Sequence, residues 1–121
     1  DVRVVEQGDS AAIEKKIRAL RPFHPEARLI IEGGINRPPL ERAMSRDLYR
    51  MAKQLAAEMG MTLEEASTGG GSDGNLTAAL GIPTLDGLGG VGGGAHARDE
   101  HVVIHELARR AALIAALMAR L

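Results

Sequence analysis

Two kinds of apolar spacing alternate along residues 1–35. Three valines near the start have the close spacing of a β-strand: Val2, Val4 and Val5. Helical spacing follows, with Asp9 or Ser10 as the expected N-cap before Ile13, Ile17 and Leu20. Prolines in RPFHP end this helix, and residues 28–33 (RLIIEG) predict a second strand rich in β-branched side chains. Residues 1–35 therefore predict a strand–helix–strand unit, half of a ferredoxin-like domain.

Residues 36–121 predict a second unit. A helix is expected from Pro38 or Pro39 to Gly60, with one apolar stripe for core packing: Met44, Leu48, Met51, Leu55 and Met59. Strands are expected over 61–65 and 82–87, separated by a short helix over 75–80 that Gly81 closes. The last helix, over 100–121, has apolar residues on one side: Ile104, Leu107, Ile114, Leu117, Met118 and Leu121. This order of elements favours an α/β fold.

Composition narrows the classes of function. The chain has 121 residues, 45% of them hydrophobic, and a net charge of −1, so neither nucleic acid nor an anionic membrane surface is an expected partner. The apolar stretch 102–121 contains Arg109 and Arg110, which argues against a membrane span. No cysteine is present, which excludes disulfides and thiolate metal sites and fits a cytoplasmic location. The chain enters a strand pattern without an initiator methionine, so we expect a segment of a longer protein.

Glycines gather in one part of the chain. Of 15 glycines, 11 fall between Gly69 and Gly94. A glycine run before a helix can present several backbone amides to a carboxylate or a phosphate, and a tightly turned loop without a ligand is an equally good interpretation. No lysine follows the glycines, which argues against a nucleotide P-loop. Asp73 is a candidate N-cap for the short helix as much as a chemical group.

The second glycine cluster, GGVGGGAHARDEHV, places one histidine directly after a glycine hinge. His96 has the character of a loop metal ligand, with Asp99 and Glu100 available as carboxylate partners of that ligand. One histidine does not make a zinc site, which needs three or four protein ligands. His101 and His105 share a helix face but lack the glutamate of the protease helix motif, so we interpret both as surface or half-buried histidines. His24, in a turn, is expected to be solvated.

These residues add up to a family resemblance. The stretch TGGGSDGNLTAALGIPTLDGLGGVGGGAHARDEHV and the amphipathic helix after it resemble the C-terminal end of the M20-type dinuclear zinc exopeptidases and amidohydrolases. That family includes glutamate carboxypeptidase, aminoacylase, acetylornithine deacetylase and succinyl-diaminopimelate desuccinylase. DVRV, the helix after it and RLIIEGGINRPP resemble the second half of the family's lid, or dimerisation, domain. The resemblance implies half a lid domain over 1–35 and the C-terminal part of the catalytic domain over 36–121.

The resemblance also implies roles for individual residues. His96 matches the last metal ligand of the family, which binds one of two zinc ions, with cobalt or manganese as alternatives. Gly70, Gly71 and Ser72 match the loop that faces the substrate carboxylate, and Arg37 lies near a position where lid-domain basic groups contact substrate. Asp73 is expected to shape the loop, and Glu100 to support the metal ligand.

The family's other ligands and its general-base glutamate precede this segment, so no catalytic residue is expected here. The resemblance implies a substrate with an amide next to a free carboxylate: a C-terminal amino acid such as glutamate, or an N-acyl amino acid. It also implies a missing N-terminal catalytic part, a homodimer formed through the lid, and a segment that is inactive alone. The alternatives are a self-associating module without catalytic activity, favoured by an incomplete sheet with an open edge, and, with less support, a glycine-loop phosphate binder.

Overall fold

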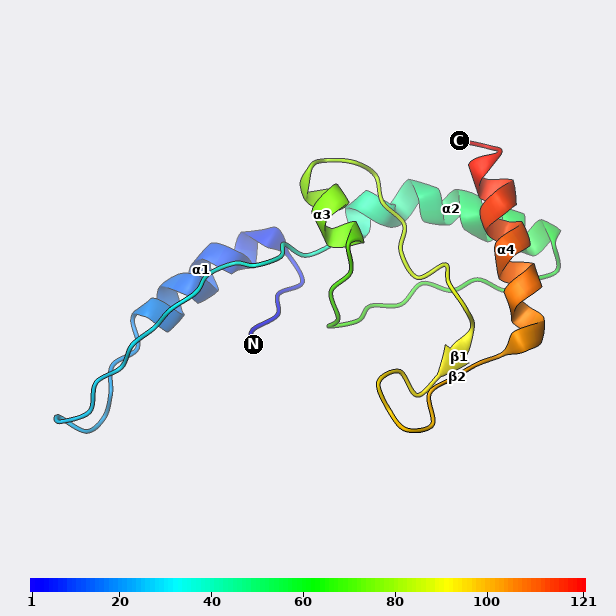
Figure 1. Ribbon diagram of the computed structural model, residues 1–121. Helices are drawn as coiled ribbons and strands as arrows, with labels where there is room; N and C mark the ends of the chain where they lie inside the picture. The colour runs from blue at the N-terminus through cyan, green and yellow to red at the C-terminus, as the bar shows by residue number, and fades with distance from the viewer.

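Helices dominate the computed structural model, which describes residues 1–121. In chain order the elements are α1 (Gln7–Arg18), α2 (Arg42–Glu58), α3 (Gly74–Ala79), β1 (Gly92–Gly93), β2 (His101–Val102) and α4 (Ile104–Met118) (Figure 1). The two short strands pair antiparallel, with Gly92 opposite Val102 and Gly93 opposite His101. Helices together with a small sheet agree with the predicted α/β class. None of the helices has the length and apolar character needed to cross a membrane.

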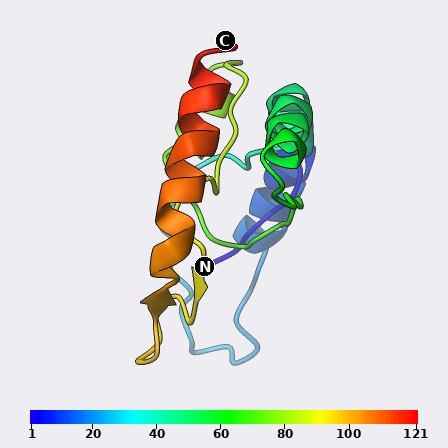
Figure 2. The same ribbon diagram turned by 90° about the vertical axis from the view of Figure 1, so that its right-hand side faces the viewer.

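The core lies where α2 and α4 pack side by side (Figure 2). Five buried residues form it: Ala52, Leu55 and Ala56 from α2, and Leu113 and Leu117 from α4. The two alanines have little side chain, so the helix axes approach closely and the leucines fill the space between them. Only 7 of 121 residues are buried, so this one helix pair carries most of the apolar stabilisation.

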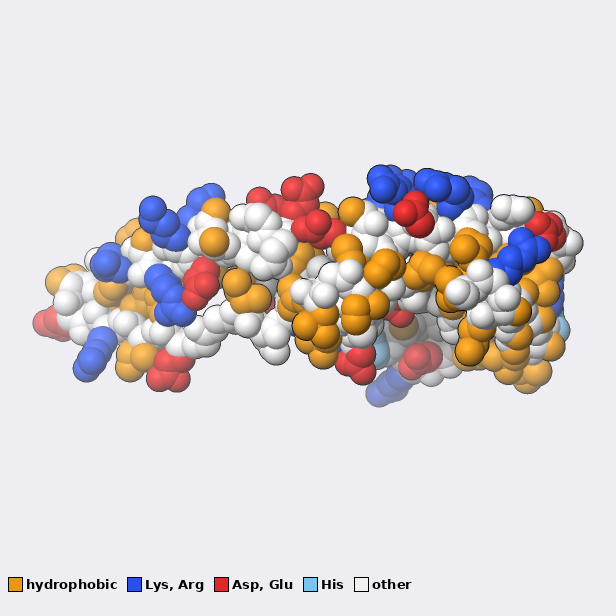
Figure 3. Space-filling view, turned by 90° about the horizontal axis from the view of Figure 1, so that it is seen from above, with side chains coloured by type: hydrophobic (Ala, Val, Ile, Leu, Met, Phe, Trp, Pro, Cys, Tyr) orange, Lys and Arg blue, Asp and Glu red, His pale blue; other side chains and the backbone are white.

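The predicted apolar stripes are confirmed only where a partner helix covers them. Leu55 and Leu117 are buried as expected, and Met51 packs against the core. Leu113, the largest fully buried side chain, was not in the predicted stripe. Several predicted members are exposed because nothing packs on their side of the helix: Met59, Ile104, Leu107, Met118 and Leu121. Hydrophobic side chains are accordingly visible on the outer surface at the α2–α4 end (Figure 3).

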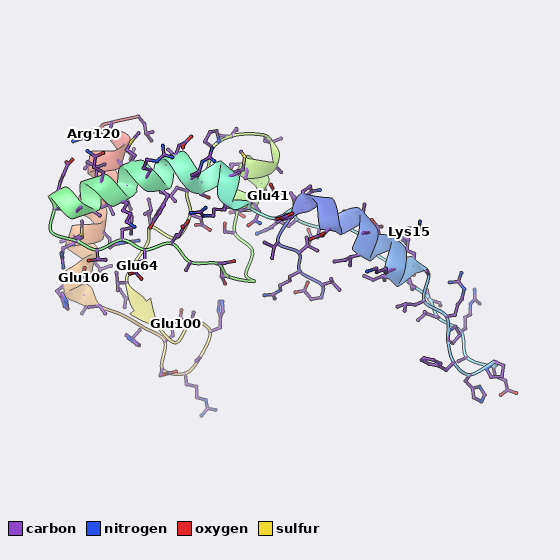
Figure 4. All side chains as sticks on the ribbon, turned by 180° about the vertical axis from the view of Figure 1, so that it is seen from behind. Lys15, Glu41, Glu64, Glu100, Glu106 and Arg120 are labelled. Atoms are coloured by element: carbon purple, nitrogen blue, oxygen red, sulfur yellow. The ribbon has the colours of Figure 1, made fainter.

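Residues 1–36 form an arm that extends away from the α2–α4 pair, beyond the start of α2 (Figure 1). After α1 the chain reverses and runs back along the helix, where Arg18 Nη2 donates to the Gly33 carbonyl at 2.9 Å (Figure 1). The start of α1 is held to the start of α2, because the Gln7 amide donates to Glu41 Oε1 at 2.8 Å. Glu41 lies at this junction (Figure 4). The arm is therefore attached mainly through its helix N-terminus.

The four predicted strands are not formed. Residues 2–5, 28–33, 61–65 and 82–87 contain no strand, so the strand–helix–strand prediction is correct only for its helix. Their side-chain patterns suit a sheet, but a strand also needs a neighbouring backbone to complete its hydrogen bonds. Thr84, for example, donates its amide to the Met44 carbonyl in α2 at 3.0 Å and not to a strand.

The glycines predicted where helices end more accurately than the capping residues predicted where helices begin. Gly60 and Gly81 follow α2 and α3 with φ of 66° and 79°, as predicted for C-terminal glycines. The predicted caps Asp9 and Ser10 are wrong, because α1 already begins at Gln7 with Glu6 at the N-cap. The starts of α2 and α4 are later than predicted, whereas α3 begins at Gly74, one residue before its predicted start. Helix α2 begins at Arg42, and α4 begins at Ile104 because His101 and Val102 belong to β2.

Candidate functional site

The glycine loop over 68–75 is tied together by its own side chains. The Gly70 amide donates to Thr68 Oγ1 at 3.2 Å, and the Ser72 amide donates to Asn75 Oδ1 at 2.9 Å. The Gly74 amide donates to Ser72 Oγ at 3.1 Å. The Asn75 amide also donates, to the Ser72 carbonyl at 3.2 Å, so four of the loop amides are engaged, whereas the amide of Gly71 donates to no group within the chain.

Arg37 lies against this loop. A Cβ on Gly71 would lie 3.2 Å from Arg37 Cδ and 3.4 Å from its Nη1, so a glycine allows the guanidinium to lie over the backbone here. Arg37 Nη2 is 3.8 Å from Asp73 Oδ1. The chain after Arg37 is fixed to α3, since Asn75 Nδ2 donates to the Pro38 carbonyl at 2.8 Å. The structure thus brings Arg37 to the predicted loop across more than thirty residues of sequence.

Asp73 occupies the N-cap position of α3 but makes no capping hydrogen bond with its side chain. Its carboxylate is almost fully exposed and faces the Arg37 guanidinium. Ser72 satisfies the Gly74 amide in its place. Asp73 therefore adds a negative charge beside the arginine and does little to order the helix end.

Arg3 is a second arginine at the loop, and the sequence analysis did not predict it. Arg3 Nη1 donates to the Gly69 carbonyl at 2.6 Å, and its Nε pairs with Asp1 Oδ2 at 3.0 Å. A Cβ on Gly69 would lie 3.2 Å from Arg3 Nη1. Arg3 and Arg37 therefore contact the loop at Gly69 and Gly71, on either side of one residue. In the sequence Arg3 is one polar residue among valines, a pattern that any solvent-facing strand position shares.

His96 lies in the loop that joins β1 to β2. The Ala97 amide donates to the Gly94 carbonyl at 2.8 Å, and the His96 amide lies 3.4 Å from Glu100 Oε2. Glu100 is on the same loop, below the helices (Figure 4). His96 has a φ of 65°, and it is the only residue other than glycine with a positive φ. Its side chain is exposed, which leaves the imidazole free for a ligand.

The histidines and carboxylates of this chain do not by themselves form a metal site. No group of three or more His, Cys, Asp or Glu side chains is close enough to hold an ion. His101 Nδ1 lies 2.9 Å from the Asp99 carbonyl oxygen, and His105 Nε2 lies 3.6 Å from Glu106 Oε1. Both are exposed, as is His24, which agrees with their interpretation as surface residues. The donor set fits one imidazole ligand and not a complete zinc site.

A separate pocket of about 240 Å³ lies against α4, away from the glycine loop. It is lined by Ala56, Met61, Thr62, Leu63, Val91, Glu106, Arg109, Arg110 and Leu113. Arg110 is not free to bind there, because its Nη2 and Nε donate to the carbonyls of Gly87 and Gly89 at 2.8 and 3.0 Å. No predicted site residue lines this pocket.

One ion pair outside the loop changes the titration of its partners. Arg42 donates to Glu65 through Nε at 2.8 Å and through Nη2 at 2.6 Å. These hydrogen bonds and the charge of Arg42 hold the pKa of Glu65 below its ordinary value, and Glu65 raises the pKa of Arg42. Both side chains are on the surface. Basic side chains gather over α2 (Figure 3).

Comparison with known protein families gives the class of the chain first: it belongs among the peptidases, a class of hydrolases. The profile that matches is that of peptidase family M20/M25/M40, and it covers residues 4–120. The chain belongs to this family. Peptidases of this family generally use zinc or a similar metal ion. No curated protein and no solved structure matches the chain.

Proposed function

We propose that this chain forms the carboxylate-binding part of a zinc-dependent hydrolase that cleaves an amide bond next to a free carboxylate. The observation that carries the proposal is the position of Arg37 over Gly71, in a chain of the M20/M25/M40 peptidase family. The substrate is a C-terminal amino acid, such as glutamate, or an N-acyl amino acid.

The arginines supply the charge that such a substrate needs. Arg37 has no ion pair shorter than 3.8 Å, so a substrate carboxylate competes only with the solvated carboxylate of Asp73. The free amide of Gly71 is a second donor, and Arg3 adds positive charge at Gly69. Hydrogen bonds to charged groups contribute about 1.5–3 kcal/mol each. Loss of the Arg37 contact is therefore expected to weaken substrate binding by about ten- to a hundredfold.

His96 is the metal ligand of the proposal, and Glu100 holds the loop that carries it. The proposal takes the remaining ligands and the general base from residues outside these 121, and the incomplete donor set supports this. When bound in the complete site, two metal ions, zinc with cobalt or manganese as substitutes, would supply polarisation of the scissile carbonyl. Within this chain the contribution is to bind the carboxylate and to orient the substrate, so the 121 residues alone are expected to be inactive.

The test compares the chain with the longer enzyme that contains it. Zinc content and hydrolysis of an N-acyl amino acid are measured for both, and for His96→Asn and His105→Asn. Asparagine tolerates the left-handed backbone of position 96, and His105 is an exposed control on α4. The proposal is supported if only the longer enzyme contains zinc and is active, and if both properties are lost in His96→Asn and kept in His105→Asn. Turnover by the 121 residues alone would refute it.

The role of Arg37 in binding the carboxylate is tested by comparing substrates with and without that group. Arg37→Lys in the longer enzyme is expected to raise KM for the N-acyl amino acid and to leave turnover of the corresponding primary amide, which lacks the carboxylate, unchanged. Arg46→Lys is the matched control, because Arg46 is an exposed arginine of α2 paired only with Asp47. Equal losses on both substrates would exclude a role for Arg37 in binding the carboxylate.

We also propose that residues 1–35 mediate a homodimer, the second candidate function. Residues 28–32 make no hydrogen bond through their backbone, and Leu29 and Ile30 expose 46% and 67% of their surface. Antiparallel pairing with a second copy, centred on Ile30, would place Arg28 of each chain opposite Glu32 of the other. This pairing needs no other partner, because the segment is complementary to itself.

The register of this pairing is testable by exchanging charges. Sedimentation at increasing concentration is expected to show a dimer for the unchanged chain and a weaker one for Arg28→Glu or Glu32→Arg. The double exchange restores opposite charges and is expected to restore the dimer. A monomer at all concentrations, or single exchanges without effect, would contradict the pairing.

A further inference from the structure

The chain contains two Asp–Gly bonds, at positions 73–74 and 86–87, and the glycine amides of the two bonds have different hydrogen-bond partners. At the second bond the Gly87 amide nitrogen lies 2.7 Å from Asp86 Oδ1, a carboxylate oxygen of the preceding residue. Oδ1 is bonded to Cγ, so this hydrogen bond holds the carboxyl group beside the nitrogen that would attack it. Both residues are exposed, and Gly87 has no side chain to block an approach.

We propose that Asp86–Gly87 is a site of spontaneous covalent modification, at which the backbone cyclises to a succinimide and reopens as isoaspartate. The Gly87 nitrogen attacks Asp86 Cγ, an N–Cγ bond forms, and one oxygen of the protonated carboxyl leaves as water with the amide proton. Hydrolysis then adds one water across either carbonyl–nitrogen bond of the ring. One product is the original aspartate and the other is isoaspartate, whose backbone runs through the side-chain carbon.

The surrounding contacts hold the reacting atoms together. Before the turn, the Thr84 amide is fixed to the Met44 carbonyl at 3.0 Å. After it, Arg110 Nη2 donates to the Gly87 carbonyl at 2.8 Å. Gly87 has a φ of 77°, which keeps the turn tight between these two anchors. Holding reacting groups in contact in the ground state raises the rate of an intramolecular reaction.

The other Asp–Gly bond is an internal control. The Gly74 amide donates to Ser72 Oγ at 3.1 Å and so points at another residue, and Asp73 faces Arg37. Gly74 also begins α3, so ring closure there would disrupt the first turn of a helix. The geometry therefore assigns the faster reaction to Asp86, although the two bonds have the same chemistry.

Modification at Asp86 would change the packing of the glycine loop. A Cβ on Gly74 would lie 3.7 Å from Asp86 Cβ, so the two Asp–Gly turns are in contact. Leu85, the preceding residue, packs against the α2–α4 core. An extra backbone carbon between Leu85 and Gly87 must therefore displace either the core contact or the loop.

The experiment is ageing of the intact chain at neutral pH and 37 °C, followed by peptide mapping that separates aspartate from isoaspartate. The expected result is a several-fold excess of isoaspartate at position 86 over position 73. The same ageing in concentrated urea is expected to bring the two rates together, because the fold creates the difference. Equal rates in the folded chain, or a faster reaction at position 73, would overturn the proposal.

Two matched variants identify the reacting residue. Asp86→Glu requires a larger ring and is expected to remove the signal at position 86, whereas Asp73→Glu is expected to leave it unchanged. Persistence of the signal in Asp86→Glu would overturn the assignment. The comparison of positions 73 and 86 in the unchanged chain does not depend on either variant folding.

Discussion

Leu113→Ala tests whether the α2–α4 contact holds this chain together. Leu113 is fully buried against Ala52, Leu55 and Ala56, so truncation removes its apolar contacts and leaves a cavity. Large-to-small changes of this kind cost about 2–5 kcal/mol. The pocket of about 240 Å³ that Leu113 also lines gives its neighbours room to relax. We therefore expect a loss in the lower part of that range, about 2–3 kcal/mol.

The assay is urea unfolding followed by helical circular dichroism. Met118→Ala is the matched control, because Met118 ends the same helix with 71% of its surface exposed. Leu113→Ala should lower the urea midpoint clearly, and Met118→Ala should leave it nearly unchanged. For a domain of ordinary stability, about 5–15 kcal/mol, the first change removes a substantial fraction. Equal midpoints for the two variants would refute the reasoning that one helix pair carries the stability.

Two further predictions concern the hairpin and the surface ion pair. Gly92→Ala is expected to open the β1–β2 pair, because a Cβ there would collide with the His101 carbonyl. Faster hydrogen exchange of the hairpin amides would show this opening. Gly89→Ala is the control, because the space around Gly89 is open. Arg42 lowers the pKa of Glu65, so the pair stabilises the fold above the ordinary carboxyl value of 4.5, and this contribution is lost as pH falls through the lowered value. When the free energy of unfolding is measured against pH, Arg42→Ala should lose less stability on the acid side than the unchanged chain. The same pH dependence in both proteins would contradict the linkage.

Local signals in the sequence predicted the helices well. The spacing of Met51 and Leu55 is enough to predict α2, and glycine at 60 and 81 is enough to predict where α2 and α3 end. The strands could not be predicted in the same way. The run at 28–33 has the composition of a strand, but a strand also depends on a neighbour that is distant in sequence, and none pairs with it in this chain.

The same distinction applies to the candidate site. The glycine loop and His96 were found because glycine clusters and a histidine after a glycine hinge are visible locally. The family resemblance associated Arg37 and the glycine loop with the substrate separately, but neither the approach of Arg37 to Gly71 nor the contact of Arg3 with Gly69 was predicted. Both contacts join residues more than thirty positions apart, and a single sequence does not encode such distances in any local pattern.

At position 96 the left-handed backbone favours glycine for stability, whereas metal binding requires the histidine side chain. A residue with a Cβ in this conformation costs about 1–2 kcal/mol relative to glycine, and the run Gly92–Gly94 ends only two positions before it. Glycine at position 96 would therefore ease the hairpin turn while removing its imidazole. His96→Gly should give a chain that resists denaturation better and a longer enzyme that binds metal less well, so selection for stability alone would remove this histidine.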